Sequence, residues 1–330
     1  MKTEKDLRDN TFWINNNADF LNQALAVFEY QYNNNAVYRN FADNLNKTPK
    51  TVSSLTELPF LPVEFFKNHI VVSGDREAQI IFESSGTTGN LTSRHHVIDP
   101  ELYVESFVKT FRLFYGDPRK YAIIALLPSY NERENSSLVY MADRLITMSC
   151  NPASGFYKIN NNALLENIAC AEGKILLLGV SFALLDLAET HRPNLSGAIV
   201  METGGMKGRR KEITRHELHK ILTTAFNVPV IHSEYGMTEL LSQAYSKGDG
   251  IFYPPPWMKI ILRDLYDPLT LFSEPGQAGG INVIDLANIN TCSFIATGDI
   301  GKLHPDGGFE VLGRFDNSDI RGCNLLSADI

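Results

Sequence analysis

Short apolar runs alternate with amphipathic stretches through the middle of the chain. The apolar runs are Gln79–Phe82, Tyr121–Leu127, Lys174–Val180, Gly197–Met201 and Val228–His232. The stretches with helical spacing are Glu101–Tyr115, Ser136–Met148 and Ile213–Phe226. Strands of this kind, separated by helices, predict βαβ units and a mainly parallel sheet covered on both faces. We therefore expect an α/β fold.

The two ends of the chain have a different character. Residues Ala18–Tyr30 have helical spacing, and the two prolines of Leu58–Pro62 end any helix before them. The last third contains Pro254–Pro256, Gly279–Gly280 and the hairpin-like Leu303–Leu312. These features predict a helical beginning and a final region of shorter strands and turns.

Composition limits the possible partners. The 330 residues have a formal net charge of -8, which disfavours general binding to nucleic acid phosphates. The longest apolar stretch, residues 175–188, is too short and too interrupted to span a bilayer. The first ten residues contain acids and no apolar signal region, and the four cysteines form no CxxC pair. We expect a cytoplasmic protein that binds no nucleic acid and has no membrane span.

A loop rich in glycine and hydroxyl groups follows the first predicted strand. It comprises Ser84, Ser85, Gly86, Thr87, Thr88 and Gly89. Glycines let backbone N–H groups converge, and the hydroxyls add donors, so the loop suits phosphate oxygens. It is not a Walker A loop, because no Gly-Lys-Ser/Thr follows. An ordinary polar turn is the alternative interpretation.

A second motif, Ser233–Glu239, stands where the strand Val228–His232 is predicted to end. Ligands of open α/β sheets bind at the carboxyl ends of strands. Tyr235 could supply a stacking face next to Gly236, Thr238 a phosphate donor and Glu239 a metal-binding carboxylate. The alternative is a helix start with Ser233 as its cap and Glu239 in solvent.

The third and fourth motifs are Thr297-Gly298-Asp299 and Gly313-Arg314-Phe315-Asp316. A carboxylate such as Asp299 can accept from both hydroxyls of a ribose, and Arg314 can approach the same sugar or a phosphate. Each pair alone is common in turns, so only the set of four motifs is specific.

Taken in order, SSGTTG, YGMTE, TGD and GRxD resemble the adenylate-forming superfamily of acyl-CoA synthetases and adenylation domains, from about residue 83 to residue 322. Within it the chain looks most like the acyl-protein synthetases of bacterial luminescence fatty-acid reductase complexes. Phenylacetate-CoA ligases look like the next nearest relatives. The finer resemblance rests on Met201–Gly205 with the basic run Lys207–Lys211, on His232–Glu239 and on Arg321-Gly322-Cys323.

The resemblance assigns roles to particular residues. It implies that Ser84–Gly89 hold the β- and γ-phosphates of ATP, and that Gly204 and Gly205 line the adenine pocket. Tyr235 would pack beside the adenine, Thr238 would contact the α-phosphate and Glu239 would hold Mg²⁺. Asp299 and Arg314 would bind the ribose, and Asp316 would lie at the hinge before the lid of larger relatives. The implied reaction forms an acyl-adenylate from a carboxylic acid, expected to be a fatty acid.

The resemblance also implies a division of the chain. We expect a helical N-terminal segment of the large domain at residues 1–75 and an adenylate-forming core at 76–315. Residues 316–330 would be a short tail in place of the C-terminal lid. Relatives often continue the glycine loop through Pro-Lys-Gly, whereas Arg94 is the first cation after the loop in this chain. If the lid lysine is absent, a nucleotide-binding or scaffold subunit without full catalysis is the alternative to an enzyme.

The resemblance further implies that a cysteine near the end, Cys323, accepts the acyl group as a thioester before it passes to a protein such as a reductase or carrier protein. Cys150, Cys170 and Cys292 border apolar runs and are expected in the core. His232 could touch the acyl carboxylate or be structural. The pair His95-His96 has no third ligand at metal spacing, so we expect no zinc site.

Overall fold

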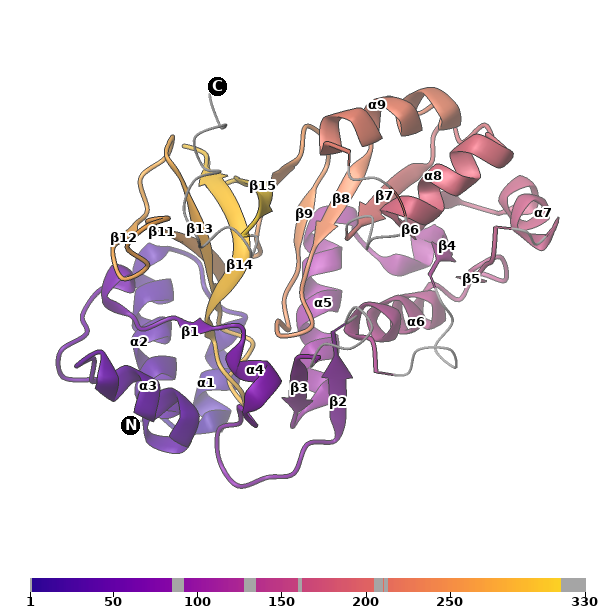
Figure 1. Ribbon diagram of the computed structural model, residues 1–330. Helices are drawn as coiled ribbons and strands as arrows, with labels where there is room; N and C mark the ends of the chain where they lie inside the picture. Colours follow the sequence, from indigo (N-terminus) through magenta and orange to yellow (C-terminus); the bar gives the residue numbers. More distant parts are fainter. Residues whose placement is uncertain are drawn as a thin grey trace.

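The computed structural model describes residues 2–84, 92–127, 135–159, 162–204, 210 and 213–315. Two sheets with their helices lie side by side, and the second sheet carries the N-terminal helices (Figure 1). The expected α/β fold is confirmed, although only the first of these two sheets is mainly parallel.

The first sheet has six strands in the order β5-β4-β6-β7-β8-β9, and all neighbours are parallel except β8 and β9. The strands are β4 (Tyr121–Leu126), β5 (Gly155–Phe156), β6 (Lys174–Val180), β7 (Ile199–Thr203), β8 (His232–Tyr235) and β9 (Ala244–Ser246). All six residues of β4 are buried, as expected for a strand covered on both faces.

Helices cover both faces of this sheet, with α5 and α6 on one side and α8 and α9 on the other (Figure 1). The helices are α5 (Pro100–Tyr115), α6 (Ser137–Ser149), α7 (Asn162–Cys170), α8 (Ser181–Thr190) and α9 (Arg215–Phe226), and η2 (Pro118–Lys120) precedes β4. Capping explains where two of them begin. The side chain of Asp99 accepts from the first turn of α5, and Thr214 forms a capping box with Glu217 at the start of α9.

The second sheet has seven strands and is mainly antiparallel, because hairpins rather than helices connect its strands. Along β10-β15-β14-β13-β11-β12 the strands are β10 (Ile251–Phe252), β15 (Phe309–Arg314), β14 (Phe294–Leu303), β13 (Ala278–Asp285), β11 (Met258–Arg263) and β12 (Leu271–Phe272). The strand β1 (Leu61–Pro62) pairs in parallel with β14. Segments from opposite ends of the chain therefore form one sheet.

The N-terminal helices pack against this second sheet. They are α1 (Glu4–Thr11), α2 (Asn17–Asn34) and α3 (Ala36–Asn44), followed by η1 (Leu55–Glu57) and α4 (Phe65–Asn68). Aromatic rings form the contact: Phe28 and Tyr38 both pack on Phe294 of β14. Phe60 meets the same ring from the segment before β1, so Phe294 is the centre of this part of the core.

The hairpin β2 (Ile80–Glu83) and β3 (Arg94–Val97) forms a separate two-stranded antiparallel sheet. The strand before the glycine-rich loop is therefore not part of the parallel sheet. The loop joins two strands of a hairpin instead of a strand and a helix.

Several sequence-based expectations need correction. The predicted strand Val228–His232 is wrong by about four residues, because Pro229 cannot donate to a ladder and β8 begins only at His232. Ser233 to Tyr235 thus belong to the strand itself. Cys150 and Cys170 are exposed at the ends of α6 and α7, and only Cys292 is in the core.

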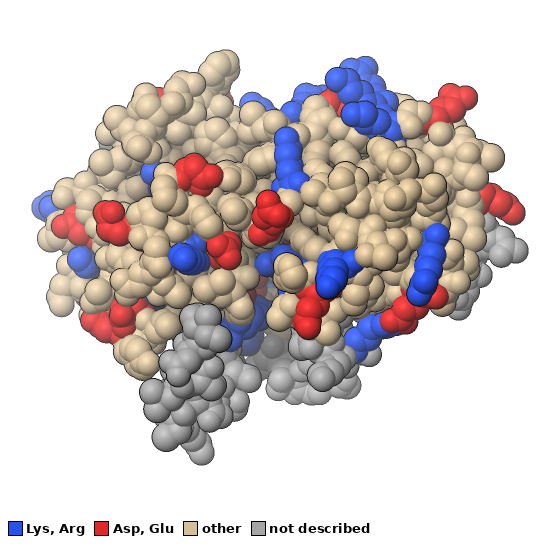
Figure 2. Space-filling view, turned by 90° about the horizontal axis from the view of Figure 1, so that it is seen from above, with Lys and Arg blue, Asp and Glu red and all other residues tan. Residues whose placement is uncertain are grey.

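Charged side chains of both signs are interspersed over most of the face seen from above (Figure 2). Within the described residues, no helix is long and apolar enough to cross a membrane.

Candidate functional site

A cavity of about 1460 Å³ lies where the two sheets, the hairpin and the N-terminal segment meet. Each of these four parts contributes to its wall. Its lining includes Phe60, Lys67, Glu83, Ser84, Ser93, Thr203, Gly204, Gly236, Thr238, Glu239, Thr297, Gly298 and Arg314. Three of the four motifs thus supply residues to one cavity, together with Ser84 at the start of the first.

Tyr235, Asp299 and Arg314 are joined between the sheets by one hydrogen bond and one ion pair. Asp299 and Arg314 are register partners on β14 and β15, and Arg314 Nε lies 3.0 Å from Asp299 Oδ1. The hydroxyl of Tyr235, at the end of β8, donates to Asp299 Oδ2 at 2.9 Å. Tyr235 and Asp299 are buried, whereas Arg314 is largely exposed and lines the cavity. The set joins residues that are far apart in the sequence.

The loop after β8 is held in place by buried polar groups. Asp285 Oδ2 accepts from the backbone N–H groups of Leu241 and Ser242 at 2.8 and 2.9 Å. Asn288 Nδ2 donates to the carbonyl of Glu239 at 2.7 Å. Because both anchors come from the second sheet or the turn after β13, the loop that carries Thr238 and Glu239 bridges the two halves of the site.

The ring of His95 supports the same loop from the hairpin side. Its Nδ1 lies 2.8 Å from the carbonyl of Thr238, and its Nε2 lies 2.9 Å from the hydroxyl of Thr291. A carbonyl can only accept, so Nδ1 carries the proton. Burial lowers the pKa of His95 to about 4, and the ring is therefore neutral at physiological pH. His95 acts as a positioning residue for Thr238.

Glu239 is a buried carboxylate in the wall of the cavity. Burial raises the pKa of its carboxyl, while hydrogen bonding from Ser93 and the positive charges of Arg314 and Lys67 oppose this rise. Mg²⁺ is commonly held by one or two carboxylates together with substrate phosphates. A buried carboxylate that lines the cavity fits such an ion, and Glu239 is the residue that would hold it.

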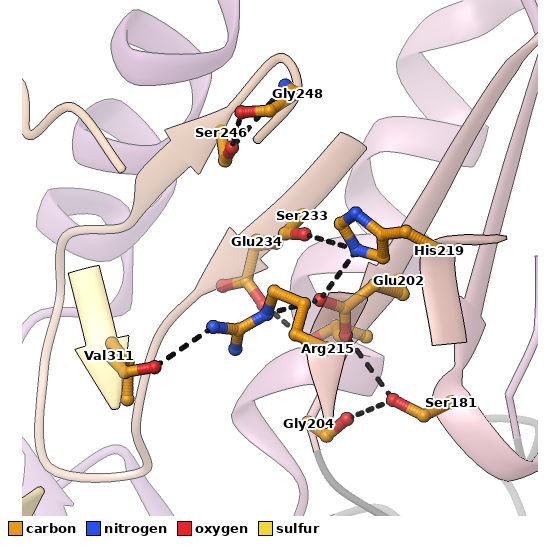
Figure 3. A network of polar contacts seen from close by, with 11 residues as sticks. Ser181, Glu202, Gly204, Arg215, His219, Ser233, Glu234, Ser246, Gly248 and Val311 are labelled. Carbon is orange, nitrogen blue, oxygen red and sulfur yellow. Dashed lines mark hydrogen bonds and ion pairs between the residues drawn. The ribbon is translucent and has the colours of Figure 1, made fainter. Parts of the chain in front are cut away.

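Gly204 lies at the end of β7 within a polar network (Figure 3). Its carbonyl accepts from the hydroxyl of Ser181, which also lies 3.3 Å from Glu202 Oε2. Arg215 of α9 binds Glu202 Oε1 through Nε at 3.1 Å, and His219 Nε2 lies 3.7 Å from the same oxygen. Burial would raise the pKa of Glu202, but His219 and Arg215 lower it below its ordinary value. The network fixes the backbone that is predicted to meet the adenine.

Ser84 closes the base of the glycine-rich loop. Its backbone N–H donates to the carbonyl of Ser93 at 3.1 Å, and its hydroxyl accepts from the N–H of Ser93 at 3.0 Å. The remaining predicted phosphate-binding residues, Ser85 to Gly89, lie outside the described residues, as do Gly205, Asp316 and Cys323. Their predicted roles stay predictions. His232 is half-buried, and its Nδ1 lies 3.1 Å from the Tyr115 hydroxyl.

The sequence reasoning missed several residues of the cavity. Arg263 donates to the carbonyl of Ile281 and to Asn282 Oδ1, both at 2.8 Å, and its guanidinium packs on Phe315. Gln243 Oε1 and Asn282 Nδ2 are buried in the cavity wall without a hydrogen-bond partner among the described residues. Buried polar atoms of this kind indicate that a ligand completes their bonding. No local sequence pattern identifies these residues, because isolated polar residues in or beside strands do not form a motif.

The amino-acid sequence is similar to that of one known ligase. No family model matches the chain. It is 24% identical to the long-chain-fatty-acid–luciferin-component ligase of Vibrio harveyi, over 91% of this chain and 85% of that protein.

Solved structures share the fold. The chain is similar to 2-hydroxyisobutyryl-CoA ligase in complex with an adenylate, with a TM-score of 0.65, 11% identity, and coverage of 91% of this chain and 68% of that one. It is also similar to ATP-bound MatB from Rhodopseudomonas palustris, with a TM-score of 0.54, 18% identity and coverage of 73% of this chain. The chain spans about half of MatB, 50% of its length. The chain therefore has the fold of the adenylate-forming ligases, in agreement with the resemblance of its four motifs.

Proposed function

We propose that the protein activates a carboxylic acid with ATP, forms an acyl-adenylate and transfers the acyl group to a protein thiol. The observation that carries the proposal is that Thr238, Glu239, Gly298 and Arg314, from three of the motifs, line a single cavity. There Arg314 pairs with Asp299, which also accepts from Tyr235. The resemblance of their motifs implies a nucleotide contact for Tyr235, Thr238, Asp299 and Arg314, and an Mg²⁺ contact for Glu239.

The chemistry explains why such a site suffices. An oxygen of the ionised carboxylate attacks the α-phosphorus of ATP, the bond to the β-phosphate breaks, and pyrophosphate leaves with the electron pair. No base is needed, because the acid is already ionised, so catalysis depends on positioning and on neutralising charge. Mg²⁺ held by Glu239 would supply part of that neutralisation.

A fatty acid is the proposed substrate. The cavity of about 1460 Å³ exceeds the 300–1,000 Å³ of common small-ligand pockets, which leaves room for an acid beside the nucleotide. Phe60 and Val63, two of the apolar residues before α4, line it. The name of the Vibrio harveyi relative, a long-chain-fatty-acid ligase, supports this choice.

Transfer to a CoA thiol is the alternative. It is favoured by the similarity to 2-hydroxyisobutyryl-CoA ligase, which was solved with CoA and covers 91% of this chain with a TM-score of 0.64. In the preferred reaction Cys323 would receive the acyl group and pass it to a partner such as a reductase or carrier protein. A nucleotide-binding subunit without catalysis would show neither transfer.

Exchange of labelled pyrophosphate into ATP tests the adenylation step. Exchange should require an acid and Mg²⁺, and medium or long aliphatic acids should outperform phenylacetate. Phenylacetate as the best substrate would favour the CoA ligase instead. Absence of exchange with every acid in the panel would contradict the enzyme proposal.

Mass spectrometry after incubation with ATP and the preferred acid tests the transfer step. The protein should gain one acyl group that hydroxylamine removes. Cys323→Ser should abolish this label while pyrophosphate exchange continues. A label that persists in this variant, or that maps to Cys150 or Cys170, would contradict the role of Cys323.

A further inference from the structure

Lys67, on the short helix α4, lines the cavity and has no bonding partner in the described part of the chain. Its side chain is half-buried and lines the cavity, and among the described residues none forms an ion pair or hydrogen bond with its ammonium group. The two arginines of the same wall are engaged, Arg314 by Asp299 and Arg263 by backbone and amide oxygens. Lys67 is thus a cavity cation whose hydrogen-bonding capacity is left for a ligand.

The place of α4 is determined by contacts on both sides of the site. Before the helix, β1 pairs with β14, and the N–H of Val63 donates to the carbonyl of Ala296 at 2.9 Å. Within the helix, Phe66 is buried edge-on against the ring of His95, with centroids 5.8 Å apart. His95 in turn holds the carbonyl of Thr238.

These contacts connect the helix that carries Lys67 with the loop that carries Glu239. Lys67 follows Phe66 on one helical turn, and Glu239 follows Thr238 in the supported loop. Their charges are close enough to interact, and both side chains line the cavity. A partly buried ammonium group has lost part of its hydration, and an anion can replace the lost interactions with water. The site therefore favours an anionic ligand beside Glu239.

We propose that the ammonium group of Lys67 binds the α-phosphate oxygens of ATP while the carboxylate attacks, a role that rests on the proposed function. In that step the acyl oxygen–phosphorus bond forms, and the bond between the α-phosphorus and the departing pyrophosphate oxygen breaks. The electron pair leaves with pyrophosphate, and no proton moves to or from Lys67. Lys67 acts by charge and by hydrogen bonding alone, in a place where two anions must approach each other.

Three variants test this role. Lys67→Met keeps the length of the side chain and removes the charge, whereas Lys67→Arg keeps the charge. Lys302→Met is the matched control, because Lys302 on β14 is also a half-buried lysine but does not line the cavity. The readouts are kcat and KM for pyrophosphate exchange, equilibrium binding of Mg-ATP by calorimetry, and the melting temperature.

For Lys67→Met we expect about a 10- to 100-fold fall in kcat/KM for exchange and several-fold weaker Mg-ATP binding, as for loss of one charge-assisted hydrogen bond. Lys67→Arg should retain most of the activity, and Lys302→Met should remain within about twofold of the wild type. Similar melting temperatures would show that all variants fold.

Two results would overturn the proposal: wild-type exchange and ATP binding in Lys67→Met, or an equal loss in Lys302→Met. Failure of the wild type to exchange with any acid would refute the proposed function instead. The calorimetric comparison would still test Lys67, because unchanged Mg-ATP affinity in Lys67→Met would then refute its phosphate contact.

Discussion

At the scale of single residues, Asp299 connects two motifs that the sequence separates. Both of its oxygens are already engaged within the protein, Oδ2 by a hydrogen bond from Tyr235 and Oδ1 by the ion pair with Arg314, so a bound ribose would use the remaining lone pairs. The pairing across β14 and β15 holds the carboxylate in place before any nucleotide arrives.

Asp299→Ala should weaken ATP binding about tenfold to a hundredfold, because a charge-assisted contact of roughly 1.5–3 kcal/mol is lost. Isothermal calorimetry with Mg-ATP measures this directly. Asp306→Ala is a suitable control, since it removes a similar hydrogen bond from Tyr253 (2.6 Å) at the exposed turn of the same hairpin. Equal affinity in the two variants would refute the ribose contact.

At the scale of elements, α9 is linked to both sheets by Arg215. Its guanidinium binds the buried Glu202 of β7, donates to the carbonyl of Val311 in β15 at 3.2 Å, and packs over the ring of Phe252 in β10. The close-up shows the contacts with Glu202 and Val311 converging on the Arg215 side chain (Figure 3). Arg215 therefore fixes the relative position of the two sheets beside Gly204.

Arg215→Met should lower the free energy of unfolding by about 3–5 kcal/mol, because it leaves a buried carboxylate without its cation. Arg119→Met removes the exposed pair with Asp117 and should cost less than about 1 kcal/mol. Urea denaturation followed by tryptophan fluorescence gives both values. If the two losses are similar, Glu202 does not depend on Arg215 for its charge.

Much of the fold could be predicted from periodicity. Helix α5 and strand β6 agree with the predicted ranges to within one residue, because continuous apolar runs and regular amphipathic stretches have clear signals. The position of β8 could not, because Val228 and Val230 look like strand residues while Pro229 breaks the ladder. The pairing of β1 with β14 and the support of Thr238 by His95 depend on tertiary contacts, which have no local pattern.

At the scale of the whole molecule, stability should depend on pH through buried histidines. Burial lowers the pKa of His95 and of His232 from 6.5 to about 4. The unfolded chain therefore binds protons that the folded chain does not, and stability should fall as the pH decreases from about 6.5 to 4. Glu239 and Asp285, whose pKa values are raised by burial, act in the opposite sense, so a variant is needed to isolate the histidine.

His95→Gln should lose less stability across this interval than the wild type, by on the order of 2–3 kcal/mol. Unfolding free energies at pH 7, 6, 5 and 4.5 provide the comparison. His216→Gln, at an exposed position of α9, should keep the wild-type slope. Parallel slopes for all three proteins would show that His95 is not held neutral.

The edge of β14 has a consequence for how the protein is made. One edge of this strand is covered by β13, and the other is shared by β1 at Ile295–Ala296 and by β15 from Asp299 onward. During synthesis, β1 and the N-terminal helices leave the ribosome more than two hundred residues before the strand that covers them. Until β14 has been synthesised, the apolar faces of those helices stay exposed in the nascent chain, where chaperones can bind them. Refolding of the complete chain should be slow for the same reason, since closing so long a loop precedes any gain from the β1–β14 contact.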